Sequence, residues 1–164
     1  MIILGIDPGL AILGYGLLRV EGSRIECLQH GVITTTPRQP TPHRLRAIYL
    51  GVDQLFTIYQ PDEVAFEELF FSKNVTTGMA VSAARGVALA ACAQRTDELY
   101  EYTPMQVKQA VTGHGGAEKR QVQQMVKLLL HLDEIPKPDD AADAVAVALT
   151  HAHSRTMKHL YKIK

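Results

Sequence analysis

The sequence predicts an α/β domain: a mixed five-stranded sheet, with a three-strand antiparallel meander and two parallel strands, flanked by helices. Aliphatic and β-branched runs at 2–7, 14–20 and 24–36 follow one another with short turns or loops between them, which favours antiparallel neighbours. Two more strand-like runs, 63–67 and 98–102, each follow a segment of helical length. Strand–helix–strand units produce parallel neighbours through right-handed crossovers, so these two runs complete the sheet.

Helices are predicted from apolar periodicity and from terminal signals. Between Thr41, a plausible N-cap, and Pro61, apolar residues recur at three- and four-residue spacing. The segment 74–95 is rich in small residues and poor in charges, which indicates a helix that is buried or packed closely against another. The remaining helices are expected to start at Thr103-Pro104, to span 118–130 and to run from about Asp139 to His153.

Length and composition suggest one domain, expected over 1–157, followed by a short basic tail at 158–164. The chain has 164 residues, of which 46% are hydrophobic, enough for an ordinary core. It shows no signal-peptide pattern and no apolar run of about 18 residues, and Cys27 and Cys92 fit buried free thiols, so a cytoplasmic location is expected. The 17 basic and 17 acidic residues cancel, which at face value argues against a nucleic-acid-binding protein.

Two acidic residues end predicted strands. Pro8 cannot donate to a sheet ladder, so the first strand should stop at Asp7, and the fourth strand ends in Glu67. If these strands are parallel neighbours, both carboxylates lie at the same sheet edge, where α/β proteins bind ligands. Taken alone, Asp7 fits a turn residue and Glu67 a surface acid.

A third source of acids is the start of the last helix. Asp140 and Asp143 are three residues apart and therefore share a helix face, yet the helix continues with the apolar run 144–149. Buried carboxylates need a counter-charge, and an all-oxygen set with Asp7 and Glu67 suits Mg²⁺ or Mn²⁺ rather than zinc. Two such ions would hydrolyse a phosphodiester. Setting these four acids aside leaves 13 acidic against 17 basic residues, which permits a nucleic-acid partner.

Basic and aromatic residues surround this predicted cluster. Lys108 and Lys119 flank a glycine-bearing loop that contains His114, and could reach a phosphate, although each alone fits a solvated surface charge. Phe70 and Phe71 follow Glu67 closely, so an aromatic ring is expected beside the acids. Such a ring could pack in the core or stack on an unpaired base, and the residues alone leave both interpretations open.

Four stretches resemble the RuvC family of bacterial Holliday junction resolvases, and the likeness runs in order to about His153. They are GIDPGLAILGYG (5–16), FEELFFSKN (66–74), TPMQVKQAVTGHGGAEKRQVQQMV (103–126) and DDAADAVAVALTHAH (139–153).

The resemblance implies a ribonuclease H-like fold and a homodimer that cuts two opposed strands of a four-way DNA junction with Mg²⁺. It implies that Asp7, Glu67, Asp140 and Asp143 form a catalytic, metal-binding tetrad. It also implies that Phe70 inserts near the junction centre, that Lys108 and Lys119 lie at the scissile phosphate, and that the partners are the RuvA and RuvB branch-migration proteins. The helix at 74–95 is the expected dimer contact, because its small residues permit close approach.

Three alternatives remain at this stage. An actin-like or sugar-kinase-like ATPase also begins with a strand ending in Asp-x-Gly, but it needs two such domains. A ribonuclease H-like nuclease acting on RNA, including pre-16S ribosomal RNA, would not be expected to carry the 66–74 and 117–124 stretches. A DNA-binding module without activity would be expected to have lost some of the four acids, and all four are present.

Overall fold

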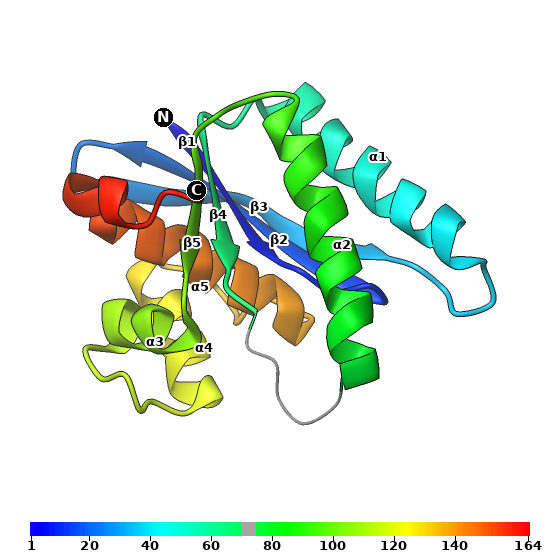
Figure 1. Ribbon diagram of the computed structural model, residues 1–164. Coiled ribbons are helices and arrows are strands. Elements are labelled where there is room, and N and C mark those ends of the chain that lie inside the picture. The colour runs from blue at the N-terminus through cyan, green and yellow to red at the C-terminus, as the bar shows by residue number, and fades with distance from the viewer. Residues whose placement is uncertain (70–74) are drawn as a thin grey trace.

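The protein is described by a computed structural model over residues 1–69 and 75–164, which confirms the mixed five-stranded sheet. The strands lie in the order β3-β2-β1-β4-β5 (Figure 1). The β1–β2 and β2–β3 pairs are antiparallel, and the β1–β4 and β4–β5 pairs are parallel, as predicted. Their bounds are β1 (Ile2–Asp7), β2 (Ile12–Glu21), β3 (Arg24–Thr34), β4 (Glu63–Glu67) and β5 (Leu99–Tyr102).

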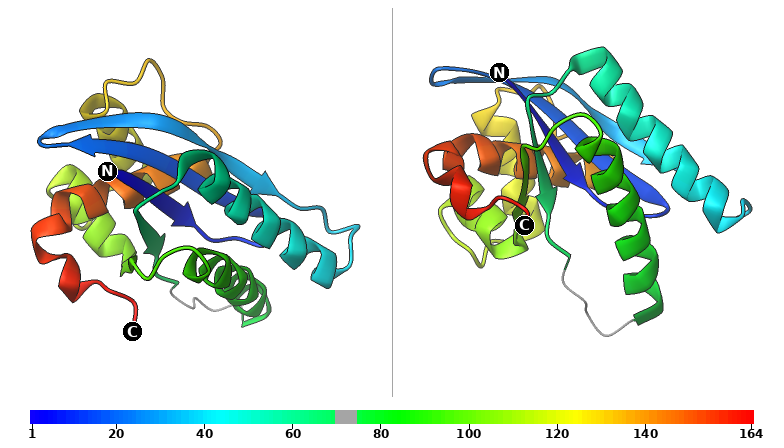
Figure 2. Two further views of the ribbon diagram at one scale, coloured as in Figure 1. Left: turned by 90° about the horizontal axis from the view of Figure 1, so that it is seen from above. Right: turned by 45° about the horizontal axis from the view of Figure 1, so that its top comes forward.

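Helices cover both faces of the sheet (Figures 1 and 2). The helices α1 and α2 pack together on one face, while α5 crosses the other face with α3 and α4 outside it. Apolar side chains of the described residues form a core on each side. No helix in the described part of the chain is long and apolar enough to cross a membrane. The bounds are α1 (Thr41–Tyr59), α2 (Val75–Ala93), α3 (Pro104–Thr112), α4 (Lys119–Leu129), α5 (Asp139–Ser154) and the 3₁₀ helix η1 (Arg155–Leu160).

The cap of α1 differs from the prediction. Pro40, not Thr41, caps α1, because its carbonyl oxygen accepts hydrogen bonds from the backbone nitrogens of His43 and Arg44 at 3.0 and 3.2 Å. In α5, Pro138 occupies the cap position, and the helix begins at Asp139 as expected. The Asp139 side chain is therefore available for other contacts.

Side-chain alternation in β1 and β4 decides which residues meet α5. In β1, Leu4 and Ile6 belong to the core beneath α1 and α2, whereas Ile3 belongs to the core beneath α5. Because side chains alternate along a strand, Asp7 faces the α5 side. The same alternation in β4 brings Glu63 and Glu67 to the α5 side, at opposite ends of the strand.

Glu63 lies in a buried polar cluster far from the sheet edge that carries Asp7. His151 of α5 is fully buried between the hydroxyl oxygen of Tyr102, 2.7 Å from Nδ1, and a Glu63 carboxylate oxygen, 2.8 Å from Nε2. Burial raises the pKa of Glu63, but hydrogen bonds from Lys158 and His151 outweigh burial and leave this pKa below its ordinary value. Lys158 therefore faces an ionised, buried carboxylate.

The segment at 158–164, expected as a basic tail, lies along β5 and is held by ion pairs. The ammonium of Lys158 binds Glu63 and lies 3.0 Å from a Glu98 oxygen, and Lys162 lies 2.9 Å from the other Glu98 oxygen. The backbone nitrogen of Ile163 donates to the carbonyl of Leu99 at 3.0 Å. The segment thus covers part of the exposed edge of β5, which would otherwise offer unpaired backbone groups to another chain.

Substitution Lys158→Met is expected to destabilise the fold. It removes a cation from the buried Glu63 carboxylate, which should cost about 2 kcal/mol and lower the Tm by about 4–8 °C. The matched control is Lys137→Met, since Lys137 pairs with Glu134 at 3.8 Å and both side chains are 79% exposed. That control should change stability by less than about 0.5 kcal/mol in thermal unfolding. Equal Tm values for the two variants would show that Lys158 does not stabilise the buried Glu63 carboxylate.

Candidate active site

Asp7 and Glu67 lie side by side at the ends of two parallel strands. Ile6 of β1 is in register with Phe66 of β4, so the next residues, Asp7 and Glu67, are neighbours at one sheet edge, as predicted. The Asp7 carboxyl shares a hydrogen bond with Glu67. Burial, and then the negative charge of Glu67, raise the pKa of Asp7 to about 8. Burial also raises the pKa of Glu67, although the hydrogen bond from Asp7 lowers it in part.

The close contact of α5 with the sheet depends on glycines that the sequence analysis did not single out. A Cβ atom at Gly14 of β2 would lie 2.0 Å from the carbonyl oxygen of Asp140, and one at Gly5 of β1 would lie 2.1 Å from that of Ala144. Any other residue would hold the helix off the strands. A glycine inside a strand often marks such a close backbone approach, so the GYG sequence at 14–16 carried a usable signal.

Asp140 and Asp143 lie in the first turns of α5, beside Asp7. Both are half-buried, and both raise the pKa of Asp7 by their charge. Burial raises the pKa of Asp143, while a hydrogen bond and the charge of Lys119 act in the opposite direction. The structure therefore brings the four predicted acids from β1, β4 and α5 to one edge of the sheet.

The two predicted lysines approach this cluster from α3 and α4. A cavity of about 230 Å³ is lined by Lys108, Lys119, Glu67 and Asp143, together with apolar residues of α3, α4 and α5. The Lys119 ammonium lies 2.7 Å from an Asp143 oxygen. Partial burial lowers the pKa of Lys119, but Asp143 and Asp139 outweigh burial and raise it above its ordinary value.

The segment after Glu67 leaves the sheet through Glu68, whose backbone nitrogen donates to the carbonyl of Tyr102 at 2.8 Å. Phe70, the predicted aromatic contact, lies outside the described residues. Nearby, Arg85 of α2 pairs with Glu101 of β5 at 2.5 Å, and its guanidinium lies 6.0 Å from the centre of the Phe66 ring. This pair ties α2 to the strand ends that carry Glu67, and sequence reasoning missed it because the two residues are 16 positions apart.

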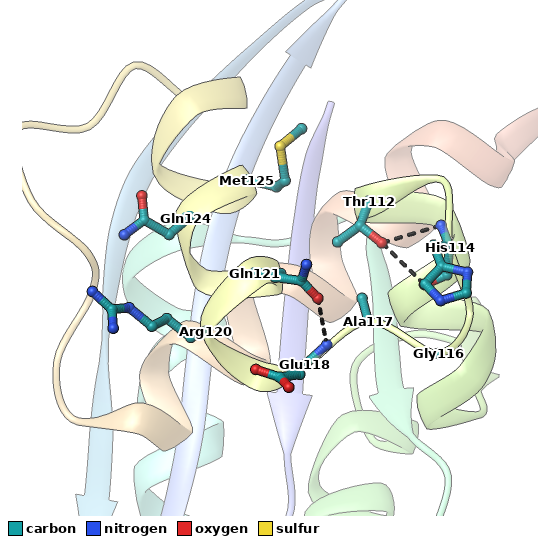
Figure 3. A pocket seen from close by; sticks show the side chains of 9 residues that line it. All are labelled: Thr112, His114, Gly116, Ala117, Glu118, Arg120, Gln121, Gln124 and Met125. Atoms are coloured by element: carbon teal, nitrogen blue, oxygen red, sulfur yellow. Dashed lines mark hydrogen bonds between the residues drawn. The ribbon is translucent and has the colours of Figure 1, made fainter.

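His114 lies in a separate pocket of about 780 Å³ (Figure 3). The Thr112 hydroxyl donates to the His114 carbonyl at 3.0 Å and accepts from its backbone nitrogen at 3.2 Å, which fixes the turn between α3 and α4. Across the pocket, the backbone nitrogen of Glu118 donates to the Gln121 side chain at 2.8 Å and so starts α4. None of the four acids lines this pocket, so the loop positions Lys119 without joining the acid cluster.

The donor chemistry of the cluster fits a hard divalent cation. Across residues 1–69 and 75–164, no group of three or more His, Cys, Asp or Glu side chains has an arrangement that could hold a metal ion. Instead, the Lys119 ammonium supplies the positive charge at Asp143, and Asp7 retains its proton at neutral pH. Three of the four neighbouring carboxyl groups, those of Asp7, Glu67 and Asp143, have raised pKa values. A bound cation would offset the repulsion among these groups, and oxygen ligands suit Mg²⁺.

Comparison with known proteins decides the family. The family model described as crossover junction endodeoxyribonuclease RuvC matches residues 3–151. The chain belongs to the RuvC family. A RuvC relative from Alkaliphilus metalliredigens, described as a crossover junction endodeoxyribonuclease, is 59% identical over 164 residues, which cover 100% of both chains.

Solved structures agree with this assignment to RuvC. A structure of Thermus thermophilus RuvC in complex with Holliday junction substrate superposes with a TM-score of 0.91 at 40% identity, covering 96% of each chain. The yeast mitochondrial Holliday junction resolvase Ydc2 superposes with a TM-score of 0.69 at 14% identity, covering 98% of this chain and 82% of its own. The second likeness shows a shared fold alone. The mixed five-stranded sheet and the RuvC structure agree with the ribonuclease H-like fold that the resemblance implies.

Proposed function

We propose that this protein is a crossover junction endodeoxyribonuclease, which resolves Holliday junctions in recombination and DNA repair by hydrolysing phosphodiesters in two opposed strands. The main support for this proposal is the set of four carboxyl groups from β1, β4 and α5 at one sheet edge, in a chain of the RuvC family. The Thermus thermophilus relative with a Holliday junction substrate supports the same substrate here. We propose a cytoplasmic location, which a DNA substrate supports.

The proposed roles follow from position and charge. Asp7, Glu67, Asp140 and Asp143 bind Mg²⁺, two ions per site, and Mn²⁺ is a possible substitute. When bound, the metal supplies Lewis-acid stabilisation of the charge that develops during hydrolysis. Asp7 must give up its proton to bind a cation.

The basic and aromatic residues serve the DNA. Lys119 and Lys108 orient the scissile phosphate from the cavity wall, since both line the cavity that Glu67 and Asp143 share. Phe70, which follows β4 by three residues, stacks on an unpaired base near the junction centre.

The proposed partners are a second copy of this chain and the RuvA and RuvB branch-migration proteins. Paired cuts in a two-fold junction call for two active sites related by one symmetry axis. The proposed dimer contact is α2. Its Ala84, Ala88 and Ala91 are buried in the core of their own domain, so the contact would use the opposite face, where Met79 is 68% exposed.

A nicking assay on a synthetic four-way junction tests the proposal, with a linear duplex of the same sequence as its control. With Mg²⁺, the protein is expected to cut two opposed strands of the junction and to leave the duplex intact. With EDTA in place of Mg²⁺, cleavage should fall by about 100-fold or more, because the metal supplies several kcal/mol of transition-state stabilisation. Junction binding should persist in a gel-shift assay. Equal cutting of the duplex, or undiminished cutting in EDTA, would reject the proposed function.

A further inference from the structure

Lys119 lies between two carboxylates, only one of which belongs to the predicted tetrad. Its ammonium nitrogen is 2.7 Å from Oδ2 of Asp143 and 3.4 Å from Oδ2 of Asp139. The amide of Gln123, one turn further along α4, donates to Oδ1 of Asp139 at 3.0 Å. Asp139 is therefore held across the gap between α5 and α4 with one oxygen directed at Lys119.

As an acid in the first turn of α5, Asp139 interacts favourably with the helix dipole, but this general effect does not explain its contact with Lys119. Pro138 occupies the cap position of α5, so Asp139 is not the helix cap. Its side chain is 68% exposed, and exposed ion pairs of this kind contribute little to folding stability. The contact with Lys119 therefore indicates that Asp139 affects the position of the Lys119 ammonium.

The contact between Lys119 and Asp143 conflicts with metal binding. A divalent cation held by the Asp143 carboxylate would repel an ammonium that remains at hydrogen-bond distance from the same group. Lys119 must therefore leave Asp143 when the cation arrives. Asp139 already lies 3.4 Å from the ammonium nitrogen, so a small shift of one flexible side chain gives Lys119 a full ion pair there.

We propose that Asp139 is a positioning residue that receives Lys119 when a cation occupies Asp143. Asp139 then keeps the ammonium at the edge of the site, where the DNA phosphate arrives, and Gln123 keeps Asp139 in place. The inference rests on the proposed function, because it assumes that Asp143 binds the metal. It adds two residues, Asp139 and Gln123, that lie outside the predicted tetrad and pair of lysines.

A double-mutant cycle on the metal-free, full-length protein tests this proposal without any activity measurement. The Mg²⁺ affinity is taken from the rise in Tm during a Mg²⁺ titration of wild type, Asp139→Asn, Lys119→Met and the double variant. Asp139→Asn is expected to weaken Mg²⁺ binding about threefold in the wild-type background, because the displaced Lys119 loses its ion pair. In the Lys119→Met background the same substitution should change the affinity less than about 1.5-fold. Lys119→Met alone should tighten binding, since it removes the competitor for Asp143.

Two further variants complete the experiment. Asp139→Glu keeps the charge and should restore most of the affinity, whereas Asp133→Asn, which removes an exposed acid from the loop before α5, should leave it unchanged. An equal loss from Asp139→Asn in both backgrounds would mean that Asp139 acts on the cation only through its own charge, and this overturns the inference. The inference is also overturned if Asp139→Asn leaves the Mg²⁺ affinity unchanged in both backgrounds. In contrast, if Mg²⁺ does not raise the Tm of the wild type, this result overturns the proposed metal site and the inference that rests on it.

Discussion

Replacing Asp7 with Asn is expected to abolish junction cleavage while making the metal-free protein more stable near pH 8. The side chain keeps its size, and the amide keeps one oxygen, but the anionic ligand at the centre of the acid cluster is lost. A decrease in the cleavage rate of about 100-fold or more is expected, because several kcal/mol of electrostatic stabilisation are at stake. Junction binding should be retained, since the lysines at the site are unchanged.

The stability effect follows from the raised pKa of Asp7. This pKa is about 8 in the folded protein, against an ordinary value of 3.8, so the folded state binds the proton more tightly than the unfolded state. The stabilisation from this proton is fully present below pH 4 and is lost as the pH rises through about 8. Asn carries no such titration. The variant should therefore gain about 1–2 kcal/mol on the wild type at pH 8, a Tm difference of about 2–8 °C, with little difference at pH 4.

Thermal unfolding in EDTA between pH 4 and pH 9 measures this difference, with Asp133→Asn as the control for loss of an exposed acid. The Tm difference between Asp7→Asn and wild type should grow with pH, whereas that of the control should stay flat. In the presence of Mg²⁺ the wild type should be more stable than Asp7→Asn, because only the wild type retains all four proposed ligands. A variant that cleaves junctions at the wild-type rate would show that Asp7 is not part of the active site.

Substitution Gly14→Ala is expected to damage both the fold and the site. Its Cβ would lie 2.0 Å from the carbonyl oxygen and 2.5 Å from the carbonyl carbon of Asp140, and neither atom belongs to a side chain that can rotate away. The start of α5 must then shift from the sheet. We expect a loss of about 3 kcal/mol, a Tm decrease of about 6–12 °C, and strongly reduced cleavage, because Asp140 and Asp143 move with the helix.

The matched control is Gly86→Ala in α2, where a Cβ meets nothing within 4 Å. A helical Gly-to-Ala change without a steric clash should stabilise the fold by about 0.5–1 kcal/mol. Thermal unfolding and the Mg²⁺-dependent Tm rise are measured for both variants. Unaltered stability and Mg²⁺ response in Gly14→Ala would show that α5 does not depend on the close approach.

The strand and helix pattern could be predicted from local physics because each element carries its own signal. Pro8 ends β1 and leaves Asp7 at its end, the capping residues around Thr103 start α3, and apolar periodicity marks α1. The pattern also predicts the β1–β4 parallel pair, which places Asp7 beside Glu67. These predictions use only backbone geometry and short-range side-chain preferences, so the chain order is sufficient for them.

Contacts between residues that lie far apart in the sequence could not be predicted from local signals. The Arg85–Glu101 pair, the buried Glu63–His151–Lys158 cluster and the docking of 158–164 on β5 each join elements that the sequence does not mark as neighbours. The sequence predicts only a short basic tail at 158–164, whereas Lys158 and Lys162 both form ion pairs with acids of the same chain. Their pairing depends on where α5 ends relative to β4 and β5, which is a property of packing.

The sequence by itself determined which residues are proposed to carry the chemistry, because the four acids and two lysines sit in motifs of fixed spacing. Only the tertiary structure decided how these groups share charge. Packing of α5 onto Gly5 and Gly14 buries Asp7 among three other acids and raises its pKa to about 8. The same packing brings α4 beside the start of α5, so that Lys119 contacts both Asp143 and Asp139. Burial and distance, which set these pKa values and ion pairs, arise only once separate elements are packed together.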